Sequence, residues 1–280
     1  MAGRSDGLTV CRWLLGVLAA VWPSDRPAAQ VAPNRAATYL HPTDVRDARA
    51  IWVNPAGLGV LREASVYAEV SVSKPGARGR LEQLNAGFNA RGLAFAYQRD
   101  QFDSGERGHT YRIGLAGAAE ALAAGAAIAH YRGTGAKATG WDLGATYHWR
   151  PSVTVGAVVA NIGQPDVRGV ELPLTMIPGV TLRPLGGVAL SAQALATTDS
   201  VAAYAFGLAW RAGLGGGRWP LEVIARLDTD GGLRRGAFAF GISIGGQDRV
   251  GVIATTPGDV SGIEAASMYG VATRKPLTRR

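Results

Sequence analysis

Cysteine is almost absent from this chain of 280 residues. The one cysteine, Cys11, lies ahead of the first apolar run, so the body of the protein has no disulfide and no thiolate metal site. No uninterrupted apolar run reaches the length of about 18 residues that a membrane-spanning helix needs. The fold therefore rests on backbone hydrogen bonds and apolar contacts alone.

A concentrated basic region is also missing. The formal net charge is +8, but residues 1–30 contribute +1 (three Arg against two Asp) and the four basic residues of 274–280 contribute +4. The remaining +3 is scattered over the body, without a basic stripe or a recognisable nucleic-acid motif. We expect no nucleic-acid partner, and the basic tail 274–280 has no assigned role.

The first thirty residues are typical of a secretory signal. Arg4 and Arg12 give a positive start, residues 13–22 form the apolar run, and small residues at 27–30 offer a cleavage site. Ten apolar residues are too few to span a bilayer as a helix. The sequence predicts export with cleavage near residue 30, and an uncleaved N-terminal anchor is the alternative.

What the chain does have is alternation of apolar with small or polar side chains in segments of about ten residues. In the segment 141–149, Trp141, Leu143, Ala145, Tyr147 and Trp149 share one face, opposite polar and small residues. Gly and Asp/Gly turns separate such segments. The expected strands are 65–72, 83–90, 93–99, 110–118, 122–132, 139–150, 152–161, 177–184, 187–196, 201–211, 219–228, 235–244, 248–256 and 262–273.

Three stretches do not follow this pattern. Residues 31–62 are irregular, with a possible short helix around 44–49, and the link 163–176 is long enough for a surface loop. The alanine-rich stretch 118–124 has high helix propensity, but the glycines at 114, 117 and 125 favour a hairpin that turns between Ala118 and Ala121.

These patterns predict an all-β fold, a transmembrane antiparallel up-and-down β-barrel of 12–14 strands, with 14 favoured, because lipid admits only helices and closed sheets. The expected parts are a signal peptide (1–30), an N-terminal plug (31–62), the barrel (63–273) and the basic tail (274–280). Trp141, Tyr147 and Trp149 are expected at the lipid interface. Trp141 and Trp149 are about 26 Å apart along a strand, or about 20 Å in height after a 40° tilt. The alternative is a soluble secreted β-sandwich that serves as a binding module.

No catalytic or metal-binding pattern survives inspection. Ser243 lies in a G-x-S-x-G match, yet the apolar alternation of a strand continues through it, whereas a nucleophilic serine needs a sharp strand-to-helix turn. The four histidines lack ligand spacing, and no phosphate-binding loop or dinucleotide motif is present. We expect neither an enzyme nor a cofactor.

The motif Asn54-Pro55-Ala56-Gly57-Leu58 precedes the first clear strand, and a second motif, at 155–163, ends in Asn-Ile-Gly. In these motifs the chain resembles the FadL-type fatty-acid transporters and the related PorV-type outer-membrane proteins, over residues 38–272. The resemblance implies a 14-stranded outer-membrane barrel in which Asn54, Pro55, Ala56 and Gly57 belong to a plug or gate.

The inward faces of the expected strands supply a polar lumen. Its expected lining residues are Tyr67, Glu69, Asn85, Asn89, Arg112, Asp142, Thr146, His148, Glu222 and Arg226. The expected function is passive transport of small hydrophobic molecules through a plugged lumen in the bacterial outer membrane. The alternative is a PorV-like scaffold that does not transport and instead docks other envelope proteins.

Overall fold

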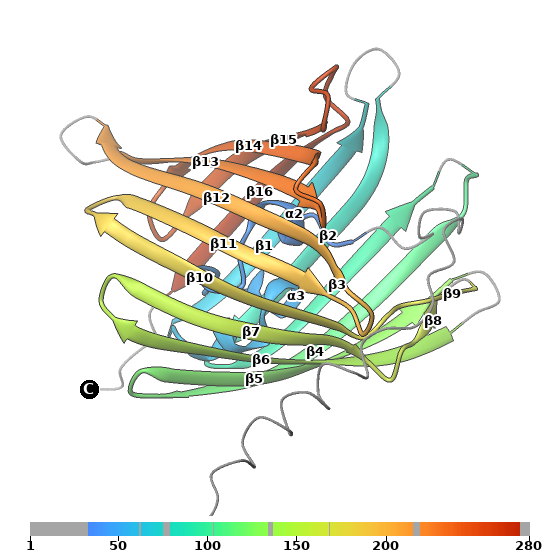
Figure 1. The fold of residues 1–280 in the computed structure, drawn as a ribbon, viewed down its shortest axis with the longest axis horizontal. Helices are drawn as coiled ribbons and strands as arrows, with labels where there is room; N and C mark the ends of the chain where they lie inside the picture. Colours follow the sequence, from blue (N-terminus) through green and yellow to red (C-terminus); the bar gives the residue numbers. More distant parts are fainter. Residues whose placement is uncertain are drawn as a thin grey trace, which may run out of the picture.

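A computed structural model describes residues 33–61, 63–74, 79–102, 104–133, 137–167, 169–214 and 219–274. Fourteen antiparallel strands close into one barrel, with β1 paired to β16 (Figure 1). The barrel strands are β1 (Ala64–Ser73), β2 (Arg80–Ala90), β3 (Leu93–Gln101), β4 (Arg107–Ala119), β5 (Leu122–Arg132), β6 (Lys137–Arg150), β7 (Val153–Ile162), β10 (Thr175–Leu185), β11 (Val188–Ala196), β12 (Val201–Leu214), β13 (Trp219–Asp230), β14 (Arg235–Gly245), β15 (Arg249–Pro257) and β16 (Ala265–Arg274).

The 14-stranded barrel predicted from the sequence is confirmed, and each expected strand overlaps one observed strand. The expected hairpin at 118–121 is also confirmed, since β4 ends at Ala119 and β5 begins at Leu122. The alternative of a soluble β-sandwich is excluded, because the strands form one closed ring rather than two stacked sheets.

The two faces of the strands carry different side chains. In β1, Ser65, Tyr67 and Glu69 are buried, while Val66 is 54% exposed on the outside of the ring. Large apolar residues recur on the outer face of most strands. Apolar side chains outside and polar ones inside are the arrangement of a barrel that spans a membrane.

The two ends of the barrel differ in the length of their connections. At the end where β1 begins and β16 finishes, successive strands are joined by two to four residues. At the opposite end the connections have four to twelve residues. Short periplasmic turns and longer extracellular loops are typical of outer-membrane barrels. We call these the short-turn end and the long-loop end.

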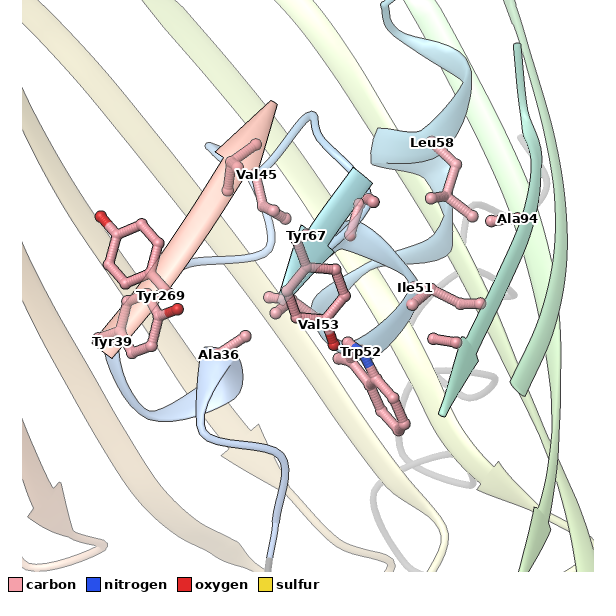
Figure 2. Packing of buried hydrophobic residues seen from close by; sticks show 14 of the residues in the cluster. Ala36, Tyr39, Val45, Ile51, Trp52, Val53, Leu58, Tyr67, Ala94 and Tyr269 are labelled. Carbon is pink, nitrogen blue, oxygen red and sulfur yellow. The ribbon is translucent and has the colours of Figure 1, made fainter. Parts of the chain in front are cut away.

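Residues 33–61, here called the luminal segment, lie inside the ring of strands (Figures 1 and 2). They contain α2 (Ala36–Tyr39), α3 (Ala50–Val53) and the 3-10 helix η1 (Pro55–Gly59). Ile51 and Leu58 are fully buried, and Tyr39 stacks on Tyr269 of β16 at 5.7 Å between ring centroids. None of the helices in the described residues is long and apolar enough to cross a membrane.

The helix expected around 44–49 is wrong, because the helical turns lie on either side of it. The carboxylate of Asp47 accepts the backbone N–H of Arg49 at 3.0 Å and also binds its guanidinium, which favours a turn over a helix. The link 163–176 is more ordered than a plain loop. It contains a small hairpin of β8 (Asp166–Val167) and β9 (Val170–Glu171).

Candidate functional site

The Asn-Pro-Ala-Gly motif starts η1 at the centre of the luminal segment. Asn54 has an extended backbone, and its side-chain Oδ1 accepts the N–H of Ala56 at 3.0 Å. Its Nδ2 donates to the carbonyl oxygen of Pro42 at 2.8 Å, which ties two turns of the segment together. Pro55 occupies the first helical position, where the absent N–H costs nothing. The four residues of the motif are buried.

Glycines on the inner face of the wall make room for this segment. A Cβ added to Gly144 of β6 would meet Oδ1 of Asn54, and one added to Gly125 of β5 would meet the backbone of Pro55. Four further inward glycines lie against the segment. Gly114 of β4 faces Leu58 and Ile51, and Gly156 of β7 faces Thr43. Gly179 of β10 faces Pro42, and Gly207 of β12 faces His41. The wall and the segment are therefore complementary in shape over six strands.

Long wall side chains bind the backbone of the luminal segment. Arg112 of β4 donates to the carbonyl oxygen of Ile51 at 3.0 Å and pairs with Asp142 of β6. Arg226 of β13 donates to the carbonyl oxygens of Ala37 and Leu40 at 2.8 and 2.6 Å. Because these carbonyls are inside the barrel, the arginines satisfy groups that would otherwise be buried without a partner.

Amide and carboxyl side chains hold the start of the segment. Nδ2 of Asn34 donates to Asn85 at 3.0 Å and to Gln98 at 2.8 Å. In the same row of the wall, Glu69 of β1 is opposite Asn85, and it accepts a hydrogen bond from the hydroxyl of Tyr39 at 2.9 Å. Three adjacent wall strands, β1, β2 and β3, therefore hold this part of the segment.

A charged cavity of about 450 Å³ opens between the luminal segment and the wall near the short-turn end. Asp47 pairs with Arg49 at 2.7 Å and with Arg249 of β15 at 3.0 Å. Arg249 also pairs with Glu222 of β13, and Arg183 of β10 pairs with Asp44. Burial alone would raise the pKa of Asp47, but its hydrogen bonds and attraction to Arg49 hold that pKa well below its usual range. Asp47 therefore stays ionised and links the segment to the wall.

His41 is a buried titratable group of the luminal segment. Its ring faces Gly207, and neither ring nitrogen has a hydrogen-bond partner within the described part of the chain. Burial, together with the positive charge of Arg226, lowers the pKa of His41 to about 3. The docked segment therefore requires a neutral imidazole at this position.

The residues expected to line the lumen lie on the inner face of the barrel. His148 and Glu222 are partly buried. The other eight are buried: Tyr67, Glu69, Asn85, Asn89, Arg112, Asp142, Thr146 and Arg226. They do not form a single cluster, since Glu222 borders the cavity whereas Asn85 binds the start of the segment. The expected interface aromatics point outward, with Trp141, Tyr147 and Trp149 exposed by 49%, 46% and 63%.

Sequence reasoning missed two groups of site residues. The inward glycines carried a usable signal, because they share a face with polar residues such as Asp142 and Thr146 in period-two strands. Asp47 and Arg49 carried no such signal, because their irregular segment has no periodicity. Among the described residues, no three His, Cys, Asp or Glu side chains are placed to hold a metal ion.

Comparisons with known proteins agree on the fold. No model of a protein family matches the chain, and no curated protein matches its sequence. The crystal structure of a Pseudomonas aeruginosa FadL homologue is similar at TM-score 0.50 and 9% identity, over 85% of this chain and 95% of that one. The Ralstonia pickettii toluene transporter TbuX is similar at TM-score 0.53 and 12% identity, over 84% of this chain and 97% of that one. The chain therefore has the fold of an outer-membrane β-barrel.

Proposed function

We propose that this protein is a bacterial outer-membrane barrel for passive passage of small hydrophobic molecules, and that the luminal segment is its gate. The observation that carries the proposal is the fit of residues 33–61 inside the barrel, against glycines of six strands and bonded to wall arginines. A segment that fills the lumen has to move, or leave a path beside it, before a solute can cross. Residues 1–30, the expected export signal, lie outside the described residues.

The hydrophobic cargo is supported by two observations. TbuX, which shares the fold, is a toluene transporter. In addition, the charged cavity has an apolar side made by Val45, Ile224 and the stacked rings of Tyr39 and Tyr269. An uncharged aromatic molecule would pack against this apolar side of the cavity.

A scaffold without transport is the second candidate, and the density of contacts around the luminal segment favours it. Arg112, Arg226 and Asn89 each bind segment carbonyls, and Arg249 holds its Asp47. A segment held at this many points is suited to seal the barrel permanently. The two candidates differ in whether the segment must move.

A disulfide between the segment and the wall tests this directly. The hydroxyl oxygens of Thr43 and Thr181 are 2.6 Å apart, so the two side chains point at each other, and the Thr43→Cys/Thr181→Cys pair is expected to crosslink. In a Cys11→Ser background, oxidation should abolish entry of an uncharged aromatic dye into vesicles with a lipopolysaccharide outer leaflet. Reduction should restore it.

The matched control is a crosslink within the wall. The hydroxyls of Ser71 on β1 and Ser267 on β16 are also 2.6 Å apart, and Ser71→Cys/Ser267→Cys closes the seam without touching the segment. Its oxidation should leave dye entry unchanged. Equal dye entry through the oxidised and reduced Thr43→Cys/Thr181→Cys barrel would refute the proposal that the segment is a gate. If no dye enters through the unmodified barrel, the scaffold is favoured.

Acidification is expected to open the gate through His41. Its pKa is about 3 when the segment is docked and returns to about 6.5 when the ring meets water, so the docked state loses stability as pH falls below 6.5. The loss is about 1.4 kcal/mol per pH unit, or about tenfold in the ratio of open to closed barrels. Single-channel recordings in planar bilayers between pH 7 and pH 5 measure this ratio.

The His41→Gln variant isolates the contribution of the imidazole. Asp44 and Arg226 also act on His41 through their charges, and the His41→Gln variant retains both of them. The variant should show a nearly constant ratio over this range. A pH response as steep as that of the unmodified barrel would assign the effect to another group.

A further inference from the structure

A row of basic side chains crosses the outer face of β3 to β6 at the long-loop end. Arg99 of β3 is opposite His109 of β4, His109 is opposite Arg132 of β5, and Arg132 is opposite Lys137 of β6. Their neighbours along the strands, such as Gln98 and Tyr131, are buried on the inner face, so the row points away from the lumen. None of the ten expected lumen residues belongs to it.

The rows below it, toward the middle of the barrel, change character in order. The next row is aromatic and polar, and it consists of Tyr97, Tyr111, His130 and Thr139. The row after that is apolar, and it consists of Phe95, Ile113, Ile128 and Trp141. Rows two residues apart are separated by about 6.6 Å along a strand. This succession matches hydrocarbon, interface and lipid headgroup layers, with the basic row at headgroup height.

Four basic side chains at this place have no carboxylate partner among the described residues. No ion pair between described residues involves Arg99, Arg132, Lys137 or the adjacent Arg107. The inward arginines Arg112, Arg183, Arg226 and Arg249, by contrast, are all paired with carboxylates. Like charges on directly opposite strand residues destabilise a sheet, so a bound anion would stabilise this one.

A hollow of about 440 Å³ adjoins the row and contains the groups an anionic headgroup needs. Arg107 and Arg132 line it, together with His109 and Tyr111, and Glu106 is the acidic residue of its lining. The hydroxyl of Tyr97 and Nδ1 of His109 are 2.8 Å apart, and their rings stack, which fixes the imidazole. Arginine side chains bind phosphate oxygens in a bidentate manner, and tyrosine side chains suit the boundary between the apolar layer and the headgroups.

We propose that the outer face of β3 to β6 binds the phosphorylated saccharide headgroup of an outer-leaflet lipid, such as lipid A. The long-loop end faces the outer leaflet when the short turns are periplasmic. Arg99, Arg107, Arg132 and Lys137 hold the phosphates, and the apolar row beneath them meets the acyl chains. This site is separate from the lumen and does not depend on the proposed cargo.

The test measures binding of diphosphorylated lipid A to the full barrel in detergent micelles, for the unmodified protein and for the Arg107→Gln/Arg132→Gln/Lys137→Gln variant. We expect the variant to lose at least about tenfold in affinity, because each basic residue at a membrane surface contributes about 1 kcal/mol. The charge-matched control is Lys74→Gln/Arg234→Gln/Arg235→Gln, three exposed residues at the same end, at the ends of β1 and β14 or in the adjoining connections. It should change affinity by less than about twofold. Heat-modifiability on gels verifies that each variant is folded. If the triple variant does not fold, Arg132→Gln alone should lose about fivefold in affinity.

Changing the lipid tests the phosphate itself. Dephosphorylated lipid A should bind the unmodified barrel as weakly as intact lipid A binds the triple variant. Equal affinity of the unmodified barrel and the triple variant for intact lipid A would overturn the proposal. Equal competition by phosphatidylglycerol micelles would also overturn it, because those carry phosphate without the phosphorylated saccharide.

Discussion

A valine at position 144 is expected to push the luminal segment out of its seat and to turn a closed barrel into a conducting pore. Even a single Cβ at Gly144 would occupy the place of Oδ1 of Asn54. Displacing that side chain breaks its two buried hydrogen bonds, to Ala56 and Pro42. Overpacking costs about 1–3 kcal/mol, and each unsatisfied buried group costs a similar amount. The Gly144→Val barrel should therefore show a large increase in open probability in planar-bilayer recordings.

The control is the same change on the outer face. A Cβ at Gly270 of β16 has no atom within 4 Å, and valine is favourable in a strand. The Gly270→Val barrel should conduct as the unmodified barrel does. Identical recordings from the Gly144→Val and Gly270→Val barrels would show that the segment does not depend on the glycine seat.

Removal of the Arg112 side chain is expected to cost about 3–5 kcal/mol of stability, because it leaves a buried charge without its partner. Arg112 pairs with Asp142, donates to Ile51 and lies 5.0 Å from the ring centre of Trp52. In Arg112→Ala, the carboxylate of Asp142 keeps the N–H of Asn161 as its hydrogen-bond donor among the described residues. Unfolding in urea, followed by heat-modifiability, measures the loss.

Two further variants separate the buried charge from the loss of contacts. Arg112→Ala/Asp142→Ala should recover part of the stability, because the unpaired carboxylate is gone. The side chain of Arg211 is 56% exposed and pairs with Glu222. Its removal in Arg211→Ala should lower the free energy of unfolding by less than about 1 kcal/mol. A loss for Arg112→Ala as small as that for Arg211→Ala would contradict the anchoring role of Arg112.

The strands were predictable because a barrel wall has one lipid face and one luminal face along its whole length. Alternation of side chains and turn residues carry this information locally, as the boundary between Ala119 and Leu122 shows. Closure of the ring follows from the membrane, where an open edge would leave backbone groups without hydrogen bonds.

The seat of the luminal segment was not predictable because it depends on contacts between distant residues. Arg112 binds Ile51 across 61 residues, and Arg226 binds Ala37 across 189. The helix expected at 44–49 failed for the same kind of reason, since the Asp47 carboxylate is held by Arg49 and by Arg249 far along the chain. The secondary-structure propensity of a short sequence segment does not report these contacts between distant residues.

The basic row on the outer face was hidden by strand register. Arg99, His109, Arg132 and Lys137 look scattered in the sequence, and only the pairing of four strands places them side by side. A sequence gives the face of each residue in a strand, but not its height relative to the next strand.

The measurement that tests the central claim most directly is the labelling rate of a cysteine in η1. Ala56 is completely buried between the segment and the wall, whereas Ser200 is exposed in a long-loop-end connection. In a Cys11→Ser background, a membrane-impermeant maleimide should label Ser200→Cys rapidly and Ala56→Cys far more slowly, with labelling of the two equally fast only after the barrel is denatured. Labelling of Ala56→Cys as fast as Ser200→Cys in the folded barrel would contradict a luminal segment that fills the pore.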